Sequence, residues 1–123
     1  MICLDTNYLI RGVAEGSSEA AEMIKWAESG ETLVTSMLAW FEFLCGPVTD
    51  AQVTTMDAFL SEVIPFAEIQ AVEAARLFNA INRKRPLRVD AMIAATAIVA
   101  RAGLATNNRG DFKPFEVHGL KLV

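Results

Sequence analysis

The feature that most constrains the fold of this chain is an alternation of short hydrophobic runs with longer helical stretches. Runs typical of strands cover residues 1–5, 31–36, 62–66 and 103–107, and a further run at 116–123 is typical of an edge strand. Strands separated by helices predict βαβ units, whose strands are parallel and whose helices cover the sheet. We therefore expect an α/β fold with three layers (α/β/α), a central, mostly parallel sheet and helices on both faces.

The stretches between these runs have the apolar spacing and the end signals of helices. Ser17 or Ser18 is an expected N-cap, and Gly46-Pro47 is expected to break a helix. The alanine-rich last helix has apolar residues nearly all round, which indicates a buried, central position. The expected helices cover residues 6–16, 17–30, 37–47, 49–61, 67–84 and 89–103.

Length and composition predict one domain that spans residues 1–123. The chain is 53% hydrophobic, which allows a substantial core, and it has no low-complexity linker. Its longest nearly apolar run meets Arg101 well short of the roughly 20 residues that cross a bilayer, and no signal peptide is visible. Cys3 and Cys45 lie in apolar surroundings without a CxxC motif. We expect free, reduced core thiols and a cytoplasmic protein without a membrane segment.

Four acidic residues follow the ends of predicted strands or open predicted helices. Asp5 ends the first strand, Glu42 lies in the helix after the second, Asp90 opens the alanine-rich helix, and Asp111 follows the strand 103–107. Ligands of parallel sheets gather at the carboxyl ends of the strands. All four carboxylates are therefore expected at one rim.

Each acid also has a structural explanation. Asp5 and Asp90 could each cap a helix, and Asp111 could be a turn residue. Glu42 could point to water, although it stands between two phenylalanines, where an unpaired carboxylate is seldom found. The four together favour a shared site over four separate structural roles.

Four converging carboxylates would repel one another unless a cation joined them. The chain has no Cys/His cluster, and its single histidine, His118, is near the end of the sequence, which argues against zinc. Oxygen-rich carboxylate sites suit Mg²⁺ or Mn²⁺, as one or two ions. The expected chemistry is the hydrolysis of a phosphodiester.

These acids lie in motifs that resemble a known family. The segments 4–10 (LDTNYLI), 88–98 (RVDAMIAATAI) and 105–112 (ATNNRGDF), together with Glu42 in AWFEFL, resemble the PIN domain, in particular the VapC toxin ribonucleases of toxin–antitoxin pairs. The resemblance covers essentially the whole chain. It implies a metal-dependent endoribonuclease in which Asp5, Glu42, Asp90 and Asp111 are the catalytic and metal-binding residues.

The same resemblance implies four supporting polar residues: Thr6, Asn7, Thr106 and Asn108. Thr106 would bond to a water or a carboxylate, and Asn108 would brace the loop that carries Asp111. Helix capping is an equal alternative for Asn7. At position 107 this sequence has Asn where many relatives have Arg, so no RNA contact is assigned there.

RNA is expected to need cations beside the acidic pocket, because the chain has a net charge of −4 and is a poor general binder of polyanions. The segment RKRPLR leads directly into Asp90, and two more cations flank Asp111. A solvated surface loop is the alternative for this segment. The expected RNA contacts are Arg83, Lys84, Arg85, Arg88, Arg109 and Lys113.

The helix at 37–47 has more bulky apolar residues than one core can obviously cover. We expect part of its surface to meet a second copy or an antitoxin segment, and the resemblance supports both a homodimer and a VapB-type antitoxin. The alternative is a helix covered on two sides within one domain. For the function, the alternative is an inactive PIN-like domain that binds RNA or protein, and the presence of all four acids argues against it.

Overall fold

The computed structural model describes residues 1–123, and its centre is a parallel sheet in the strand order β3-β2-β1-β4. Cys3 of β1 stands opposite Val34 of β2 and Leu104 of β4, and β2 pairs with β3 in the same direction. The predicted parallel sheet is therefore confirmed. The strands are β1 (Ile2–Leu4), β2 (Leu33–Ser36), β3 (Glu62–Ile64) and β4 (Gly103–Ala105).

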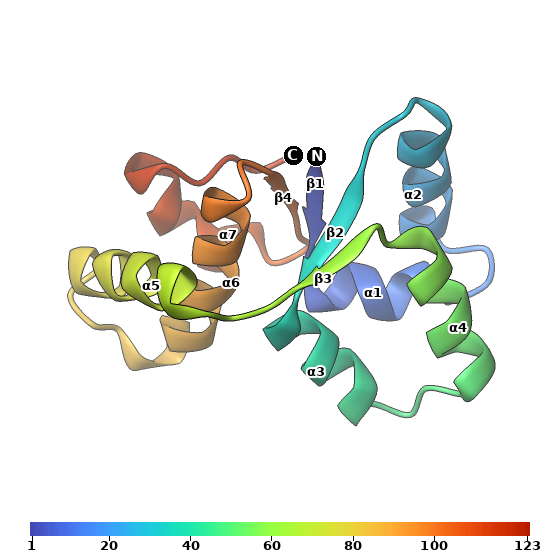
Figure 1. Cartoon of the computed structure of the whole chain (residues 1–123), viewed down its shortest axis with the longest axis horizontal. Coiled ribbons are helices and arrows are strands. Elements are labelled where there is room, and N and C mark those ends of the chain that lie inside the picture. Colours follow the sequence, from blue (N-terminus) through green and yellow to red (C-terminus); the bar gives the residue numbers. More distant parts are fainter.

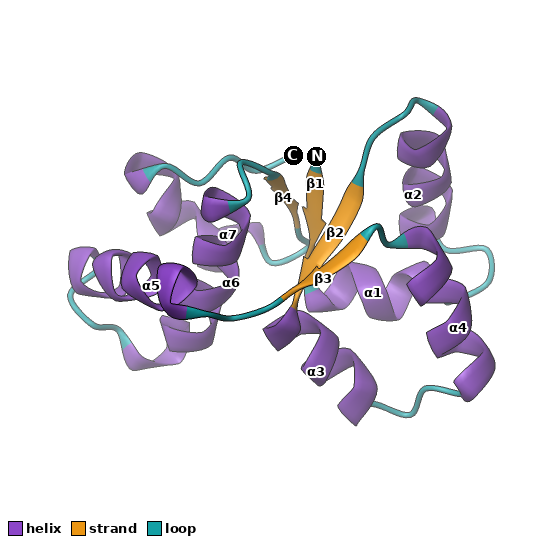
Figure 2. Cartoon of the chain, viewed as in Figure 1, coloured by secondary structure: helices purple, strands orange, loops and turns teal.

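Helices cover both faces of this sheet. In Figure 1, α5, α6 and α7 lie on one side of the strands, and α1, α2 and α4 lie on the other. Figure 2 shows the same arrangement by type of element. The α-helices are α1 (Thr6–Gly12), α2 (Ser18–Glu28), α3 (Met37–Cys45), α4 (Asp50–Phe59), α5 (Glu68–Ala80), α6 (Arg88–Val99) and α7 (Arg109–Phe112), and two 3-10 helices span Arg85–Leu87 and Lys113–His118.

Alternate strand residues point to two separate cores, as the pleat of a strand requires. Cys3 and Val34 pack with side chains of α5 and α6, whereas Leu4 and Leu33 pack with side chains of α1, α2 and α3. Each face of the sheet is thus covered by helices, which confirms the predicted three-layer architecture. No helix in the structure combines the length and the apolar character that a membrane span needs.

The alanine-rich helix is central, as predicted. In α6, Ala91 and residues 93–97 are buried between the sheet and α5. The preceding helix is shorter than expected, because α5 ends at Ala80 and the chain then turns through Asn82 and Arg83 at φ 61° and 54°. Left-handed backbone cannot continue a right-handed helix.

The predicted edge strand at 116–123 is wrong for most of its length. Residues Lys113–His118 form a 3-10 helix with a proline in its first turn, and Gly119 then reverses the chain at φ 115°. Only the last three residues reach the sheet, as one parallel bridge between Leu122 and Leu104. In this bridge the N–H of Leu104 donates to the carbonyl of Lys121, and the N–H of Val123 donates to the carbonyl of Leu104.

The two cysteines are free, but they differ in environment. Cys3 is fully buried, and burial together with the nearby charge of Asp5 raises the pKa of its thiol to about 12. Cys45 is exposed at the end of α3, so the prediction of a second core thiol is wrong.

Candidate active site

The four acids lie where the topology predicts, at the carboxyl ends of the strands. Asp5 directly follows β1, and Glu42 is in α3, which begins where β2 ends. Asp90 is in the first turn of α6, and Asp111 is in α7, after β4. Parallel strands therefore place side chains from four separate segments at one edge of the sheet.

Asp5 is the most buried of these acids, at 4% exposure. Its Oδ2 accepts a hydrogen bond of 2.7 Å from the hydroxyl of Thr106, and its Oδ1 accepts one of 2.8 Å from the backbone N–H of Thr6. Burial raises the pKa of Asp5, the charge of Glu42 raises it further, and the two hydrogen bonds partly offset these effects. Asp5 also caps α1, which confirms the structural explanation of this residue.

Asp90 shows that the acids share one electrostatic environment. Its pKa is raised to about 6, first by burial and then by the charges of Asp5, Asp111 and Glu42. It does not cap α6, because Leu87 is at the N-cap and no side chain caps that helix. The capping explanation of Asp90 is therefore wrong.

A hydrogen bond joins Glu42 to the first motif. Its Oε1 accepts a hydrogen bond of 2.9 Å from the hydroxyl of Thr6. The carboxylate is exposed, while Phe43 beside it is buried and Phe41 is 63% exposed. The apolar neighbours of Glu42 thus point to other sides of α3, and its carboxylate is free to face the other acids.

Two of the other predicted polar residues, Thr106 and Asn108, support the loop before Asp111. The backbone N–H of Asn108 donates to the Thr106 hydroxyl at 2.9 Å, and the Asn108 carbonyl accepts from the N–H of Asp111 at 3.1 Å. Asn108 braces this loop through its backbone, since its side chain forms no cap. The side chain of Asn7 makes no hydrogen bond within the chain.

Ser36 also contributes to the site, although no role was predicted for it from the sequence. It is buried, and its hydroxyl accepts the N–H of Ala39, which fixes the start of α3 and therefore the direction in which Glu42 projects. A serine immediately before a helical run is the sequence signal for such a cap.

The six predicted RNA contacts are all exposed, and they differ in whether their side chains have a hydrogen-bond partner within the chain. The guanidinium of Arg83 donates to Asn79 Oδ1 at 2.8 Å, and that of Arg109 donates to the carbonyl of Val123 at 2.7 Å. No intramolecular hydrogen bond or ion pair engages the side chains of the other four, which are Lys84, Arg85, Arg88 and Lys113.

The donor set of the site fits a hard divalent cation. No three Asp, Glu, His or Cys side chains stand close enough to enclose an ion by themselves. Mg²⁺ does not need such a cage, because it keeps several waters and binds proteins through one or two carboxylates. Asp5, which is buried, and Asp90 both have raised pKa values, and their two carboxyl groups could bind such an ion.

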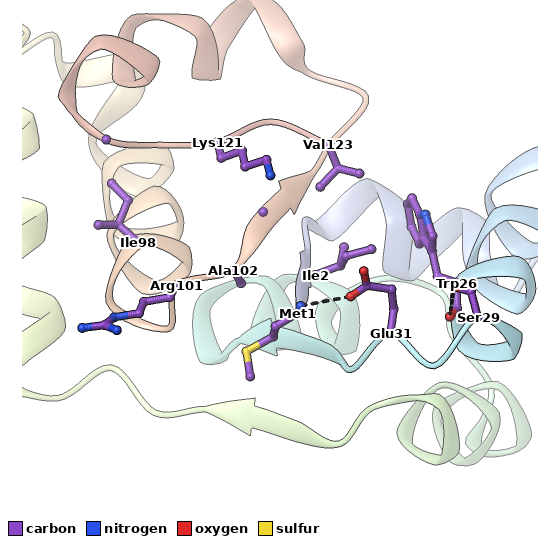
Figure 3. A pocket seen from close by; sticks show the side chains of 12 residues that line it. Met1, Ile2, Trp26, Ser29, Glu31, Ile98, Arg101, Ala102, Lys121 and Val123 are labelled. Atoms are coloured by element: carbon purple, nitrogen blue, oxygen red, sulfur yellow. Dashed lines mark hydrogen bonds and ion pairs between the residues drawn. The ribbon is translucent and has the colours of Figure 1, made fainter.

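A separate pocket lies at the other end of the strands, near the amino ends of β1 and β4 (Figure 3). It has a volume of about 600 Å³, and its lining includes Trp26, Arg101 and Lys121. The amino group of Met1 donates to Glu31 there at 3.0 Å. None of the four acids lines this pocket, so it is distinct from the candidate active site.

Comparisons with known proteins identify relatives of this chain. Ribonuclease VapC19 from Mycobacterium tuberculosis (strain CDC 1551 / Oshkosh) is 29% identical over an alignment of 121 residues that covers 94% of each chain. A chain in the crystal structure of VapBC2 from Rickettsia felis, bound to a DNA fragment from their promoter, matches with a TM-score of 0.76 and 25% identity, over 100% of this chain and 98% of that one. FitAcB from Neisseria gonorrhoeae shares the fold, with a TM-score of 0.73 and 20% identity over 99% and 96% of the two chains.

The family model of the PIN domain matches residues 2–115, a range that contains all four acids and every strand of the sheet. This chain belongs to the PIN domain family.

Proposed function

We propose that this chain is an endoribonuclease that depends on Mg²⁺ or Mn²⁺ and acts as the VapC-like toxin of a toxin–antitoxin pair. The observation that carries the proposal is the pKa of Asp90, which burial and then the charges of three acids from separate segments raise to about 6. Such mutual repulsion is costly unless a cation relieves it. Support comes from the family and from the similarity to Ribonuclease VapC19.

In this proposal Asp5, Glu42, Asp90 and Asp111 hold one or two ions. A bound ion of this kind polarises a phosphoryl group and makes water a better nucleophile near neutral pH. Thr106 and the N–H of Thr6 hold Asp5 in one orientation. Glu42 has one oxygen fixed by the Thr6 hydroxyl, and its Oε2 remains available to accept a proton from the attacking water.

The test is cleavage of mixed single-stranded RNAs by the purified chain with Mg²⁺ or Mn²⁺. We expect cleavage to stop on chelation and in Asp5→Asn or Asp90→Asn variants that still fold. Asp57→Asn is the matched control, because Asp57 is an exposed acid on α4 and perturbs neither of the raised pKa values. Folded wild-type protein that cleaves no RNA with either ion would favour the inactive PIN-like alternative.

An apolar groove beside the acids supports an antitoxin as partner. It has a volume of about 160 Å³ and lies between α1 and the α3–α4 connection, with Ile10, Val13 and Val48 in its wall. Ile10 stands one helical turn beyond Thr6, whose hydroxyl contacts Glu42. A VapB-type segment with apolar side chains here and a cation toward the acids would have complementary chemistry.

The exposed stripe of α3 supports a second copy of the chain as another partner. Met37, Phe41 and Leu44 are 43%, 63% and 46% exposed, and they stand at helical spacing on one side of α3. An apolar stripe on one helix can pair with its own copy about a two-fold axis. The domain does cover α3 on two sides, since Leu38 packs against one core and Phe43 belongs to the other, and this stripe is the side that stays open.

A further inference from the structure

The pocket at the amino ends of β1 and β4 has the size of a ligand site (Figure 3). Its volume of about 600 Å³ lies within the range of small-molecule sites, which is roughly 300–1,000 Å³. Four separate segments form it: the start of β1, the end of α2, the turn after α6 and residues 119–123. Ile2 lines the pocket and Asp5 comes three residues later, so about 10 Å of extended chain separates the pocket from the acids.

The pocket is cationic, although the whole chain has a net charge of −4. Arg101 and Lys121 line it, and no intramolecular hydrogen bond or ion pair engages either side chain. Its only acid is Glu31, whose Oε2 is already paired with the amino group of Met1 at 3.0 Å. In Figure 3 the ammonium of Lys121 points toward the middle of the pocket, with Trp26 at one end and Arg101 at the other. The unpaired positive charges favour an anionic ligand.

Trp26 provides an aromatic wall at one end of this pocket. Its ring is half-buried, and Tyr8 stacks on it with the ring centroids 5.8 Å apart, which holds the indole in one orientation. Ile2, Ile98 and Val123 add apolar surface to the lining. A small anion such as phosphate would leave this surface uncovered, whereas a ligand that also has a planar ring would cover it.

We propose that this pocket binds a mononucleotide, with its base against Trp26 and its phosphate beside Lys121. Bases stack on aromatic side chains, and phosphates form charge-assisted hydrogen bonds with lysine and arginine. The Oε1 of Glu31 accepts no hydrogen bond within the chain, so it is available to an N–H group on the edge of the base. The site needs neither the four acids nor a metal ion, so the proposal is independent of the ribonuclease function.

The probe is adenosine 5′-monophosphate, which is titrated into the protein with a chelator present, so that no metal ion holds the phosphate at the acids. The chain has two tryptophans, and in a Trp40→Phe background Trp26 alone reports on the pocket. We expect a saturable change in its fluorescence, and calorimetry is expected to give one nucleotide per chain. Ribose 5-phosphate lacks the base and adenosine lacks the phosphate, and each is expected to bind at least about tenfold more weakly.

A pair of lysine variants tests the position of the phosphate. Lys121→Gln removes the central cation of the pocket and is expected to weaken nucleotide binding about tenfold. Lys25→Gln is the matched control, because Lys25 is an exposed lysine on α2, the helix that carries Trp26, and does not line the pocket. It is expected to bind the nucleotide like wild type. Calorimetric titration measures the affinity of both variants.

Three results would overturn the proposal: no saturable binding at millimolar nucleotide, ribose 5-phosphate that binds as tightly as the nucleotide, or equal affinities of the two lysine variants. Asp90→Asn is expected to bind the nucleotide like wild type, and weaker binding by this variant would place the nucleotide at the acids instead. RNA cleavage is not measured in these titrations. Their failure would therefore leave the proposed ribonuclease function intact, and a protein that binds the nucleotide but cleaves no RNA would refute only that function.

Discussion

The hydroxyl of Thr106 donates a 2.7 Å hydrogen bond to Oδ2 of Asp5, a residue 101 positions earlier in the chain. Both residues directly follow strands that are neighbours in the sheet, since β1 pairs with β4 and Leu4 stands opposite Ala105. The bond is buried, and it orients the carboxylate of Asp5, whose pKa is raised mainly by burial. Two motifs far apart in sequence are therefore coupled by one contact.

Replacing Thr106 by Val is expected to destabilise the protein by about 2 kcal/mol, because it leaves a buried carboxylate without one of its donors. The backbone N–H of Asn108 also loses its acceptor, so the loop before Asp111 loosens and RNA cleavage falls. Urea unfolding and initial cleavage rates measure the two effects. Thr106→Ser keeps the hydroxyl and serves as the control. A Val variant as stable and as active as wild type would contradict this role.

Asp90 is expected to make the metal-free protein less stable as the pH rises. Its pKa of about 6 lies above the ordinary 3.8, so between these values the folded protein keeps a proton that the unfolded chain has lost. The free energy of unfolding therefore falls as the pH rises through this window, and the contribution is fully present only below about pH 4.

Asp90→Asn is expected to remove that slope. At pH 7 without metal, the variant is expected to be about 1–2 kcal/mol more stable than wild type, a value reduced for screening because the carboxyl is only half-buried. Urea unfolding of both proteins at pH 4, 5, 6 and 7 in chelator measures the difference. A variant that is less stable than wild type at pH 7 would show that the carboxylate is structurally required rather than repelled.

The parallel direction of the strands and the rim that carries the acids follow from pattern alone. In α/β folds the position just after a parallel strand is fixed by topology, so Asp5 and Asp111 could be placed without knowing any distance. The burial of α6 could also be predicted, because its apolar residues are spread nearly all round the helix axis.

What the sequence could not predict depends on long-range contacts and on backbone conformation. Nothing local distinguishes Phe41 from Phe43, yet one is exposed and the other buried, because Phe43 faces a core of the domain and Phe41 does not. The bond from Thr6 to Glu42 joins residues 36 positions apart and needs the coordinates of both helices. The false strand at 116–123 arose because its apolar pattern says nothing about the turn at Gly119.

Addition of Mn²⁺ is expected to raise the melting temperature of the wild-type protein, because an ion that binds only the folded state stabilises it by mass action. At 100 times the dissociation constant the gain is about 2.7 kcal/mol. The gain is expected to shrink below pH 6, where a proton competes for Asp90. Thermal unfolding across a Mn²⁺ series measures it. Asp57→Asn is expected to respond like wild type, and an equal response of Asp90→Asn would place the ion elsewhere.

Phe41 and Phe43 offer a matched pair for testing the exposed stripe of α3. Phe41 is 63% exposed and Phe43 is 1% exposed, so Phe41→Ser is expected to change the free energy of unfolding of the monomer by no more than about 0.5 kcal/mol, whereas Phe43→Ala costs about 3–5 kcal/mol. If Phe41 lies between two copies, its replacement weakens self-association, which sedimentation velocity at micromolar concentration measures. A Phe41→Ser protein that sediments like wild type as a dimer would place the contact between copies on another surface, and a wild-type monomer would remove the second copy from the proposed partners.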